Sequence, residues 1–277
     1  MANKKTRQLV VDSHVHIHNL NNLVHILDAT LTSFDKAVQV HKTDKDFSGV
    51  LCLTEPAGRD NFTRLKNQLD KSVATGELCR LNNSWHLDST AEDLTIAACH
   101  ESGTVIYLLA GQQIVTREKL EVLSLSAPQT VQDRMSLTAT IEAIEELGGF
   151  AILPWGVGKW LFGRGKIVSD CIKEKRGNRI AIGDNGGRPA FWKSVVQFDL
   201  AKLHDLPLLH GSDPLRVSEL RRTAGSRADI LVLDFDRDRP AQSLLNALRE
   251  NTCERIAIGA PETFMHFIRD QIALRLS

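Results

Sequence analysis

The sequence Leu9-Val10-Val11-Asp12-Ser13-His14-Val15-His16 decides the fold of this 277-residue chain. A continuous apolar run predicts a strand buried on both faces, and the polar residues after it predict that strand's carboxyl end. Alternate side chains of an extended chain share a face, so Asp12, His14 and His16 are expected to point the same way. Two imidazoles at that spacing can hold a cation, with a carboxylate as ligand or as hydrogen-bond acceptor behind the ligands. A surface strand with incidental histidines is the alternative, and we favour the metal site.

The same pattern, a short apolar run ending in polar or glycine-rich residues, recurs along the chain. The further runs lie at residues 49–53, 104–110, 150–153, 179–182, 206–209, 230–233 and 256–258. About eight buried strands predict an α/β fold, a TIM-like (β/α) barrel of seven or eight strands, regular or distorted. We expect one domain over residues 1–277. Residues 57–103 are more polar and are predicted to form a helical excursion over one barrel edge.

Charge and cysteine content limit the class of protein. Lys plus Arg and Asp plus Glu each total 34, so the formal net charge is zero, and we predict no nucleic-acid partner. No apolar run approaches the roughly 20 residues that span a bilayer, so no membrane association is predicted. The five cysteines form no CxxC pair and are expected to be reduced thiols of a cytoplasmic protein. The oligomeric state stays open.

A family resemblance follows from these motifs. The segment from Val11 to His18 resembles the opening of the PHP (polymerase and histidinol phosphatase) superfamily and also that of the amidohydrolase superfamily. Residues 49–56 and 151–156 resemble later PHP strand ends, and Gly211-Ser212-Asp213 matches the late Gly-Ser-Asp motif. The resemblance implies a barrel whose His-x-His motif binds catalytic metal, and therefore a metal-dependent hydrolase.

The chain departs from the family pattern at three expected histidines. Pro56 and Leu153 stand at two of these positions, and Pro214 follows Asp213 where the family usually has Ala-His. A three-metal cluster is therefore not expected. One divalent cation with an open position, or two held loosely, is predicted, with zinc, manganese or iron as candidates. The candidate metal ligands are His14, His16, Asp213, Glu55, Asp12, His210 and Asp184.

Two carboxylates are candidates for catalysis. Asp213 is expected to bind metal or to take a proton from the attacking water, although Ser-Asp-Pro is also a good turn sequence. Glu55 is predicted to be a ligand or general base, with a solvated loop carboxylate as an equally weighted alternative. Without the family motif, His210 would be interpreted as a hydrogen-bonded core histidine.

Two glycine-rich segments supply the predicted substrate-binding residues. The segment from Trp155 to Lys166 contains Trp155, Lys159 and Arg164, and Gly183–Arg188 adds Arg188. Such basic residues at a barrel mouth are expected to bind an anionic group. A hydrophobic cap with solvated charges is the alternative for the first segment, and a tight turn for the second.

These observations predict a metal-dependent hydrolase acting on a small anionic substrate. The basic residues favour a phosphoester slightly over an amide. The alternative is a catalytically degenerate barrel of the same type that binds a small ligand or a protein partner. The three missing histidines favour that alternative, and the retained Asp12, His14, His16 and Asp213 oppose it.

Overall fold

The computed structural model describes residues 5–127, 130–174, 180–214, 222–265 and 267–269. The helices in this part of the chain are η1 (Leu20–Asn22), α1 (Leu23–His41), α2 (Asn61–Thr75), α3 (Leu137–Glu146), α4 (Gly163–Lys173), α5 (Val196–Leu203) and α6 (Pro240–Glu250). The strands are β1 (Lys5–Val15), β2 (Phe47–Leu53), β3 (Glu55–Pro56), β4 (Cys79–Arg80), β5 (Trp85–Ser89), β6 (Thr95–His100), β7 (Val105–Leu109), β8 (Gly111–Val115), β9 (Glu121–Leu125), β10 (Phe150–Pro154), β11 (Ile180–Asn185), β12 (Leu208–Gly211), β13 (Ala228–Phe235) and β14 (Glu254–Ile258). Each of the eight apolar runs of the sequence overlaps one of these strands.

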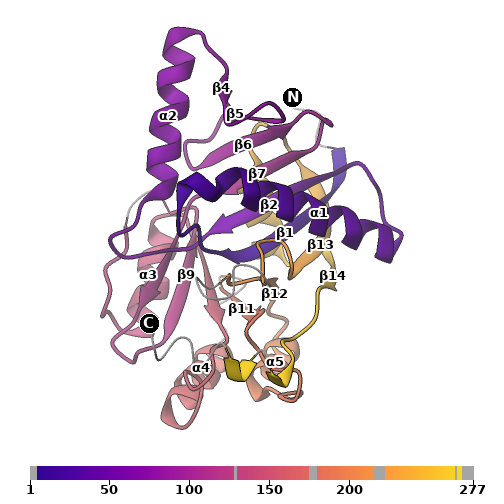
Figure 1. Cartoon of the computed structure of the whole chain (residues 1–277). Coiled ribbons are helices and arrows are strands. Elements are labelled where there is room, and N and C mark those ends of the chain that lie inside the picture. The colour runs from indigo at the N-terminus through magenta and orange to yellow at the C-terminus, as the bar shows by residue number, and fades with distance from the viewer. Residues whose placement is uncertain (1–4, 128–129, 175–179, 215–221, 266, 270–277) are drawn as a thin grey trace.

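Hydrogen bonds join the strands into two sheets (Figure 1). One has the order β14-β13-β1-β2-β7-β6-β5-β4, and the other has the order β12-β11-β10-β9-β8-β3. The pairs β1–β2, β2–β7, β10–β11 and β11–β12 are parallel, as predicted. However, β13 runs antiparallel to β1, with Val11 opposite Asp229. The α/β class is therefore confirmed, whereas the ladders of the described strands form two open mixed sheets and do not show a closed parallel barrel.

The chain passes directly from one sheet to the other at two places. Thr54 separates β2 from β3, and its N–H donates to the carbonyl of Val15 at 2.9 Å. Ala110 separates β7 from β8, where Gly111 lies so close to its neighbours that an added Cβ would be 2.5 Å from the carbonyl oxygen of Leu53. Glycine is required at this junction because the two backbones meet there.

The core has three apolar layers that explain the continuous apolar runs. Along β1, Val10 packs in the layer beneath α1 and α2, which includes Phe34. Leu9 and Val11 face the opposite way, into the layer between the two sheets, together with Ile152 of β10. A third layer joins the outer face of the six-stranded sheet to α3, α4 and α5. Strand β1 is therefore buried on both faces.

Residues 57–103, where a helical excursion was expected, contain helix α2 and the strands β4, β5 and β6. Helix α2 begins after Asp60, whose side chain accepts from the N–H of Thr63, and it ends at Gly76 in a left-handed conformation. The rest of the segment forms β4, β5 and β6, which extend the larger sheet as antiparallel strands. The prediction missed them because they lie toward the sheet's edge, where polar side chains alternate with buried ones such as Trp85 and Leu87.

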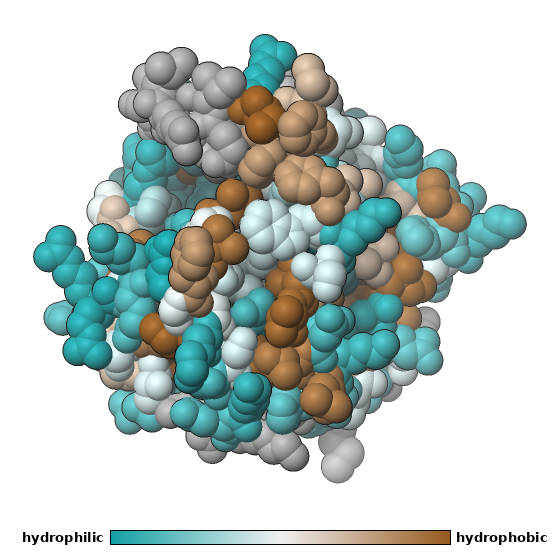
Figure 2. Space-filling view, turned by 90° about the horizontal axis from the view of Figure 1, so that it is seen from below, coloured by the Kyte–Doolittle hydropathy of each residue, from teal (hydrophilic) through white to brown (hydrophobic). Residues whose placement is uncertain are grey.

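On the face that bears α4 and α5, the apolar groups of the described residues are interspersed with polar ones (Figure 2). Exposed aromatic side chains include Phe162, Phe191 and Phe264. None of the described helices is both long and apolar enough to cross a membrane.

Candidate metal centre

His14, His16 and Asp213 lie together where the ends of β1 and β12 meet. The Nε2 atoms of His14 and His16 are 3.1 Å apart, and Asp213 Oδ1 is 3.7 Å and 3.4 Å from them. One ligand atom from each of the three residues fits within 4.8 Å of the others. The N–H of Asp213 donates to the carbonyl of His14 at 2.8 Å, which ties the two strand ends together. Among the described residues these three form the group able to hold a metal ion.

Asn185, at the end of β11, determines which nitrogen of His14 carries the proton. Its Oδ1 is 3.3 Å from His14 Nδ1, and its Nδ2 donates to Asp213 Oδ2 at 3.3 Å. Because an amide oxygen can only accept, Nδ1 of His14 is the donor in this pair. The neutral ring therefore presents the lone pair of Nε2 to Asp213 and His16, as a metal ligand requires.

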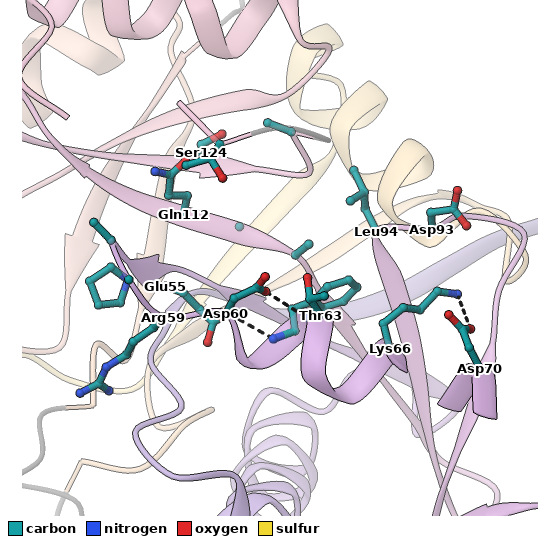
Figure 3. A pocket seen from close by; sticks show the side chains of 18 residues that line it. Glu55, Arg59, Asp60, Thr63, Lys66, Asp70, Asp93, Leu94, Gln112 and Ser124 are labelled. Atoms are coloured by element: carbon teal, nitrogen blue, oxygen red, sulfur yellow. Dashed lines mark hydrogen bonds and ion pairs between the residues drawn. The ribbon is translucent and has the colours of Figure 1, made fainter. Parts of the chain in front are cut away.

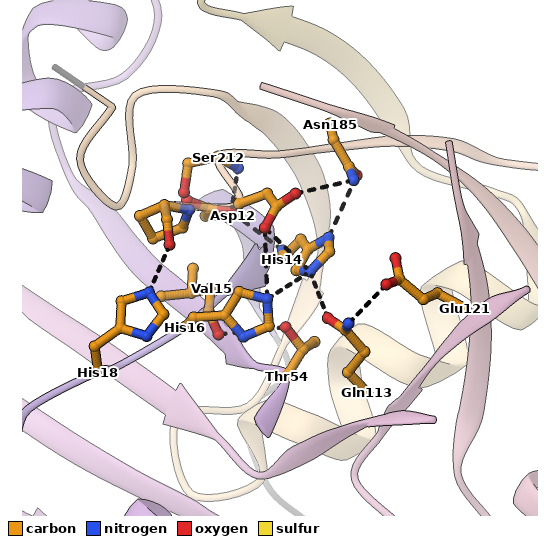
Figure 4. A network of polar contacts seen from close by, with 12 residues as sticks. Asp12, His14, Val15, His16, His18, Thr54, Gln113, Glu121, Asn185 and Ser212 are labelled. Atoms are coloured by element: carbon orange, nitrogen blue, oxygen red, sulfur yellow. Dashed lines mark hydrogen bonds and ion pairs between the residues drawn. The ribbon is translucent and has the colours of Figure 1, made fainter. Parts of the chain in front are cut away.

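Gln113 of β8 is a further polar side chain that contacts the ring of His14 (Figure 4). Its Nε2 donates to Glu121 Oε1 at 3.0 Å, so its Oε1 must be the atom 3.3 Å from His14 Nε2. Two groups with lone pairs thus face each other, and they need a proton or a cation between them. Burial lowers the pKa of His14, which disfavours the extra proton. The donor set, two imidazoles, a carboxylate and an amide oxygen, fits a divalent cation.

Electrostatics agree with this donor set. Burial opposes ionisation of Asp213, but His14, His16 and Arg222 outweigh it and hold the pKa of Asp213 well below its usual range. Nδ1 of His16, by contrast, is buried without a hydrogen-bond partner among the described residues, so none of them fixes the tautomer of this ring as Asn185 does for His14. The centre thus combines an ionised carboxylate with imidazoles that face it.

Asp12 lies behind this centre, where it organises the backbone. Its carboxylate accepts from the N–H groups of His14 at 3.2 Å, Ser212 at 2.9 Å and Gly225 at 2.8 Å. Burial raises the pKa of Asp12 to about 7 against the effect of these donors. The structure thus does not bring Asp12 into the ligand group, because its oxygens hold three backbone segments in place.

Asp184 and His210, two further predicted ligands, belong to a neighbouring ionic network. The carboxylate of Asp184 pairs with Arg188 at 2.7 Å and also with the buried Arg227. His210 Nδ1 is 2.7 Å from Asp229, and its Nε2 is 3.8 Å from Asp184. Both side chains are turned away from His14, because Asn185 and Gly211, one residue later on each strand, occupy the face toward it.

Glu55, predicted as a ligand or base, caps helix α2. Its two carboxylate oxygens accept from the N–H groups of Asn61 at 2.9 Å and Phe62 at 3.2 Å. These N–H groups belong to the first helical turn, where no intrahelical acceptor exists. Glu55 is 7% exposed, and both of its carboxylate oxygens are used to cap this helix.

The predicted substrate-binding residues have internal partners as well. Lys159 pairs with Glu121, Arg164 donates to the carbonyl of Gly158 at 2.6 Å, and Arg188 holds Asp184. Trp155 is 3% exposed and packs against the ring of Trp192. None of these four contacts the three clustered side chains in the hydrogen bonds and ion pairs of the described residues.

Sequence reasoning missed Asn185, Gln113 and Glu121. Asn185 stands next to the predicted Asp184, and Gln113 belongs to the polar cluster Gly111-Gln112-Gln113 after the run 104–110. Both residues stand at polar strand ends of the kind that the sequence pattern predicts. However, an uncharged amide side chain does not by itself indicate a metal site.

Comparisons with known proteins give structural similarity at low sequence identity. No family model matches the chain, and no curated protein matches it by sequence. The crystal structure of PsfC from Pseudomonas syringae PB-5123 is similar over 92% of both chains, with a TM-score of 0.50 and 16% identity. A two-domain protein from Bacteroides vulgatus ATCC 8482, described as containing a predicted PHP-like metal-dependent phosphoesterase, has a TM-score of 0.47 and 11% identity. The lesion-specific endonuclease PfuEndoQ from Pyrococcus furiosus has a TM-score of 0.43 and 8% identity.

These similarities concern the fold. They cover 91% of this chain in the latter two cases, but 65% and 59% of the larger proteins. One of these structures is described as containing a predicted PHP-like phosphoesterase, the superfamily that the sequence motifs resemble.

One prediction about partners was wrong. The zero net charge led us to expect no nucleic-acid partner, yet a similar structure is that of endonuclease Q in complex with a 27-mer duplex containing an abasic lesion. Net charge sums over the whole surface, whereas nucleic-acid binding depends on where positive charge gathers. A balanced composition is therefore no ground for excluding this class of partner.

Proposed function

We propose that this chain is a metal-dependent hydrolase of phosphoesters, with His14, His16 and Asp213 as the protein ligands of one divalent cation. The observation that carries the proposal is the convergence of His14 Nε2, His16 Nε2 and Asp213 Oδ1 within 4.8 Å. We also propose that the chain is one domain, since side chains from both sheets share the apolar layer between them.

Each side chain of the centre has a distinct task in this proposal. His14 and His16 contribute neutral nitrogens, and Asn185 keeps the proton of His14 on Nδ1. Asp213 acts as a ligand through Oδ1, because its Oδ2 accepts from Asn185. Gln113 directs its amide oxygen to the same point. A divalent cation, when bound there, supplies Lewis acidity and a water of lowered pKa.

A positive charge next to the centre supports an anionic substrate. Arg222 lines the same small cavity as His16, and its charge contributes to the lowered pKa of Asp213. A guanidinium beside the reacting group stabilises the oxygens of a phosphoryl group more than those of a neutral amide. Arg222 thus favours the phosphoester within the proposed function.

A second candidate function is a degenerate barrel that binds a ligand without hydrolysing it. The observation in its favour is that Glu55, Asp184 and His210 all have structural partners. The described residues then offer few side chains for a second cation or for a dedicated proton acceptor. Ligand binding without turnover is what such a reduced centre would allow.

The test is elemental analysis of purified protein beside its His14→Ala/His16→Ala variant, followed by hydrolysis of aryl phosphate monoesters and diesters. We expect about one equivalent of zinc, manganese or iron, lost in the double variant together with turnover. His41→Ala, an exposed histidine at the end of α1, serves as the matched control and should keep both. Bound metal without turnover on either ester class would favour the degenerate barrel. Full metal content in the double variant would refute the assigned centre.

A further inference from the structure

A series of adjoining cavities leads away from the metal centre. A cavity of about 50 Å³ is lined by His16 and His18, and a second of about 500 Å³ by His18 and Arg59. A third, of about 710 Å³, is lined by Arg59 and continues along helix α2. The last volume lies in the range typical of small-ligand pockets. His18 and Arg59 are therefore the shared walls between the centre and a pocket of ligand size.

Arg59 is held in place by His18. The carbonyl of Pro214, which can only accept, is 2.9 Å from His18 Nε2, so this nitrogen is the donor. His18 Nδ1 then accepts from Arg59 Nη1 at 3.2 Å. The backbone restrains Arg59 as well, because its N–H donates to the carbonyl of Pro56 at 3.1 Å in a tight turn. The guanidinium is thus fixed on one side and keeps further N–H groups for another partner.

This fixed cation lies close to the centre. The ring of His18 is 5.9 Å from the ring of His16, centroid to centroid, and Arg59 binds Nδ1 of the same His18 ring. Pro214, the acceptor for His18, directly follows Asp213 in the chain. The imidazole of His18 therefore contacts both the guanidinium and one of the clustered ligands.

Four acidic side chains line the 710 Å³ cavity together with Arg59, namely Glu55, Asp60, Asp70 and Asp93. The first three have partners, and Asp93 lies at the end of the cavity away from Arg59 (Figure 3). Glu55 and Asp60 accept from backbone N–H groups at the start of α2, and Asp70 pairs with Lys66 at 3.4 Å. In Figure 3 the Lys66–Asp70 pair lies at the opposite end of the cavity from Arg59. Across the described part of the chain, Arg59 forms no ion pair with a carboxylate. A preorganised guanidinium without a counter-ion is suited to bind a ligand anion.

We propose that Arg59, positioned by His18, binds a second anionic group of the substrate. The substrate class is then an organic phosphate ester with two anionic groups, one at the metal centre and one at Arg59. The organic part occupies the 710 Å³ cavity. The assignment as a substrate subsite rests on the proposed function, whereas anion binding by Arg59 does not.

Titration of inorganic phosphate into EDTA-treated protein, followed by calorimetry, tests the anion site without the metal. We expect Arg59→Met to weaken phosphate binding about tenfold or more, and Arg59→Lys to weaken it less, since a point charge remains. His18→Ala should weaken it about threefold, because the charge stays but loses its support. Arg80→Met, which changes an exposed residue of strand β4, is the matched control. Equal affinity in Arg59→Met and the wild type, or an equal loss in Arg80→Met, would overturn the proposal.

Kinetics of the metal-loaded protein test the subsite itself. For a phosphate ester with a second anionic group, Arg59→Met should raise KM about tenfold and leave kcat nearly unchanged, since it removes binding shared by ground and transition states. For the matching ester without that group, KM should not change. Equal KM effects on both esters would overturn the subsite. If the wild type binds phosphate through Arg59 but hydrolyses no ester with any metal, the proposed function fails while the anion site stands.

Discussion

Replacement of Glu55 separates a structural from a catalytic role for this carboxylate. Both of its oxygens accept backbone N–H groups at the start of α2, at 2.9 Å and 3.2 Å, and the side chain is 7% exposed. A hydrogen bond to a buried charged acceptor contributes about 1.5–3 kcal/mol, and water replaces part of it once the side chain is truncated. We therefore expect Glu55→Ala to lower the free energy of unfolding by about 2–4 kcal/mol. Glu55→Gln, which keeps one acceptor oxygen, should cost about half as much.

Urea unfolding measures the loss, and elemental analysis of the same samples measures bound metal. Glu77→Ala removes an exposed carboxylate beyond the other end of α2 and should change neither quantity. If Glu55 serves as a cap, stability falls while the metal content per folded protein stays constant. An unchanged free energy of unfolding together with loss of metal would refute the capping argument and restore Glu55 as a ligand.

Three further experiments test the centre and its supports. EDTA should lower Tm in the wild type but not in His14→Ala/His16→Ala, since a ligand at about 100 times its Kd contributes about 2.7 kcal/mol; equal shifts in both would count against the centre. Asp184→Asn leaves the buried Arg227 without its full counter-charge and should destabilise by about 3–5 kcal/mol in urea unfolding, with metal content preserved. Gly211→Ala places a methyl group against the Cβ of His14, so we expect a cost of about 1–3 kcal/mol and weaker metal binding. Wild-type metal affinity in Gly211→Ala would show that β12 does not position His14.

Most of the strands that sequence alone predicted are buried on both faces, whereas the edge strand β14 is largely exposed. In β1, Val10 contacts the layer under α1 while Leu9 and Val11 face the other sheet, so the whole run is apolar. Strand β5 could not be found this way, because buried Trp85 and Leu87 alternate with more exposed residues. The antiparallel direction of β13 relative to β1 could not be predicted either, because an apolar run does not indicate whether its neighbouring strand is parallel or antiparallel. The burial of a strand can be predicted from its local apolar pattern. The strand that it pairs with depends on contacts between residues far apart in the sequence.

The same limit applied to the site. His14 and His16 were predicted because their alternation on one strand is a local pattern. Asp213 was found through a family motif, and its distance of 3.4 Å from His16 arises from two strand ends far apart in sequence. Asp184 was predicted as a ligand, but successive residues of a strand face opposite sides, and Asn185 is the one that contacts His14. Chemical type identified the right strand ends, and the strand period decided which residue faces the centre.

The pairing of charges is the reason why we propose Arg59, and not the basic residues predicted from the sequence, as the binding site for a substrate anion. A chain with 34 basic and 34 acidic residues can neutralise most cations internally, and Lys159, Arg164 and Arg188 each have such a partner or a carbonyl acceptor. A cation whose charge is already matched gains little from a substrate anion, because the first partner must be given up. A cationic side chain that is held in place by a neutral group is therefore better suited to bind a substrate anion. Arg59 meets that condition through a neutral imidazole, and its place between the centre and the large cavity makes it the more informative position to mutate.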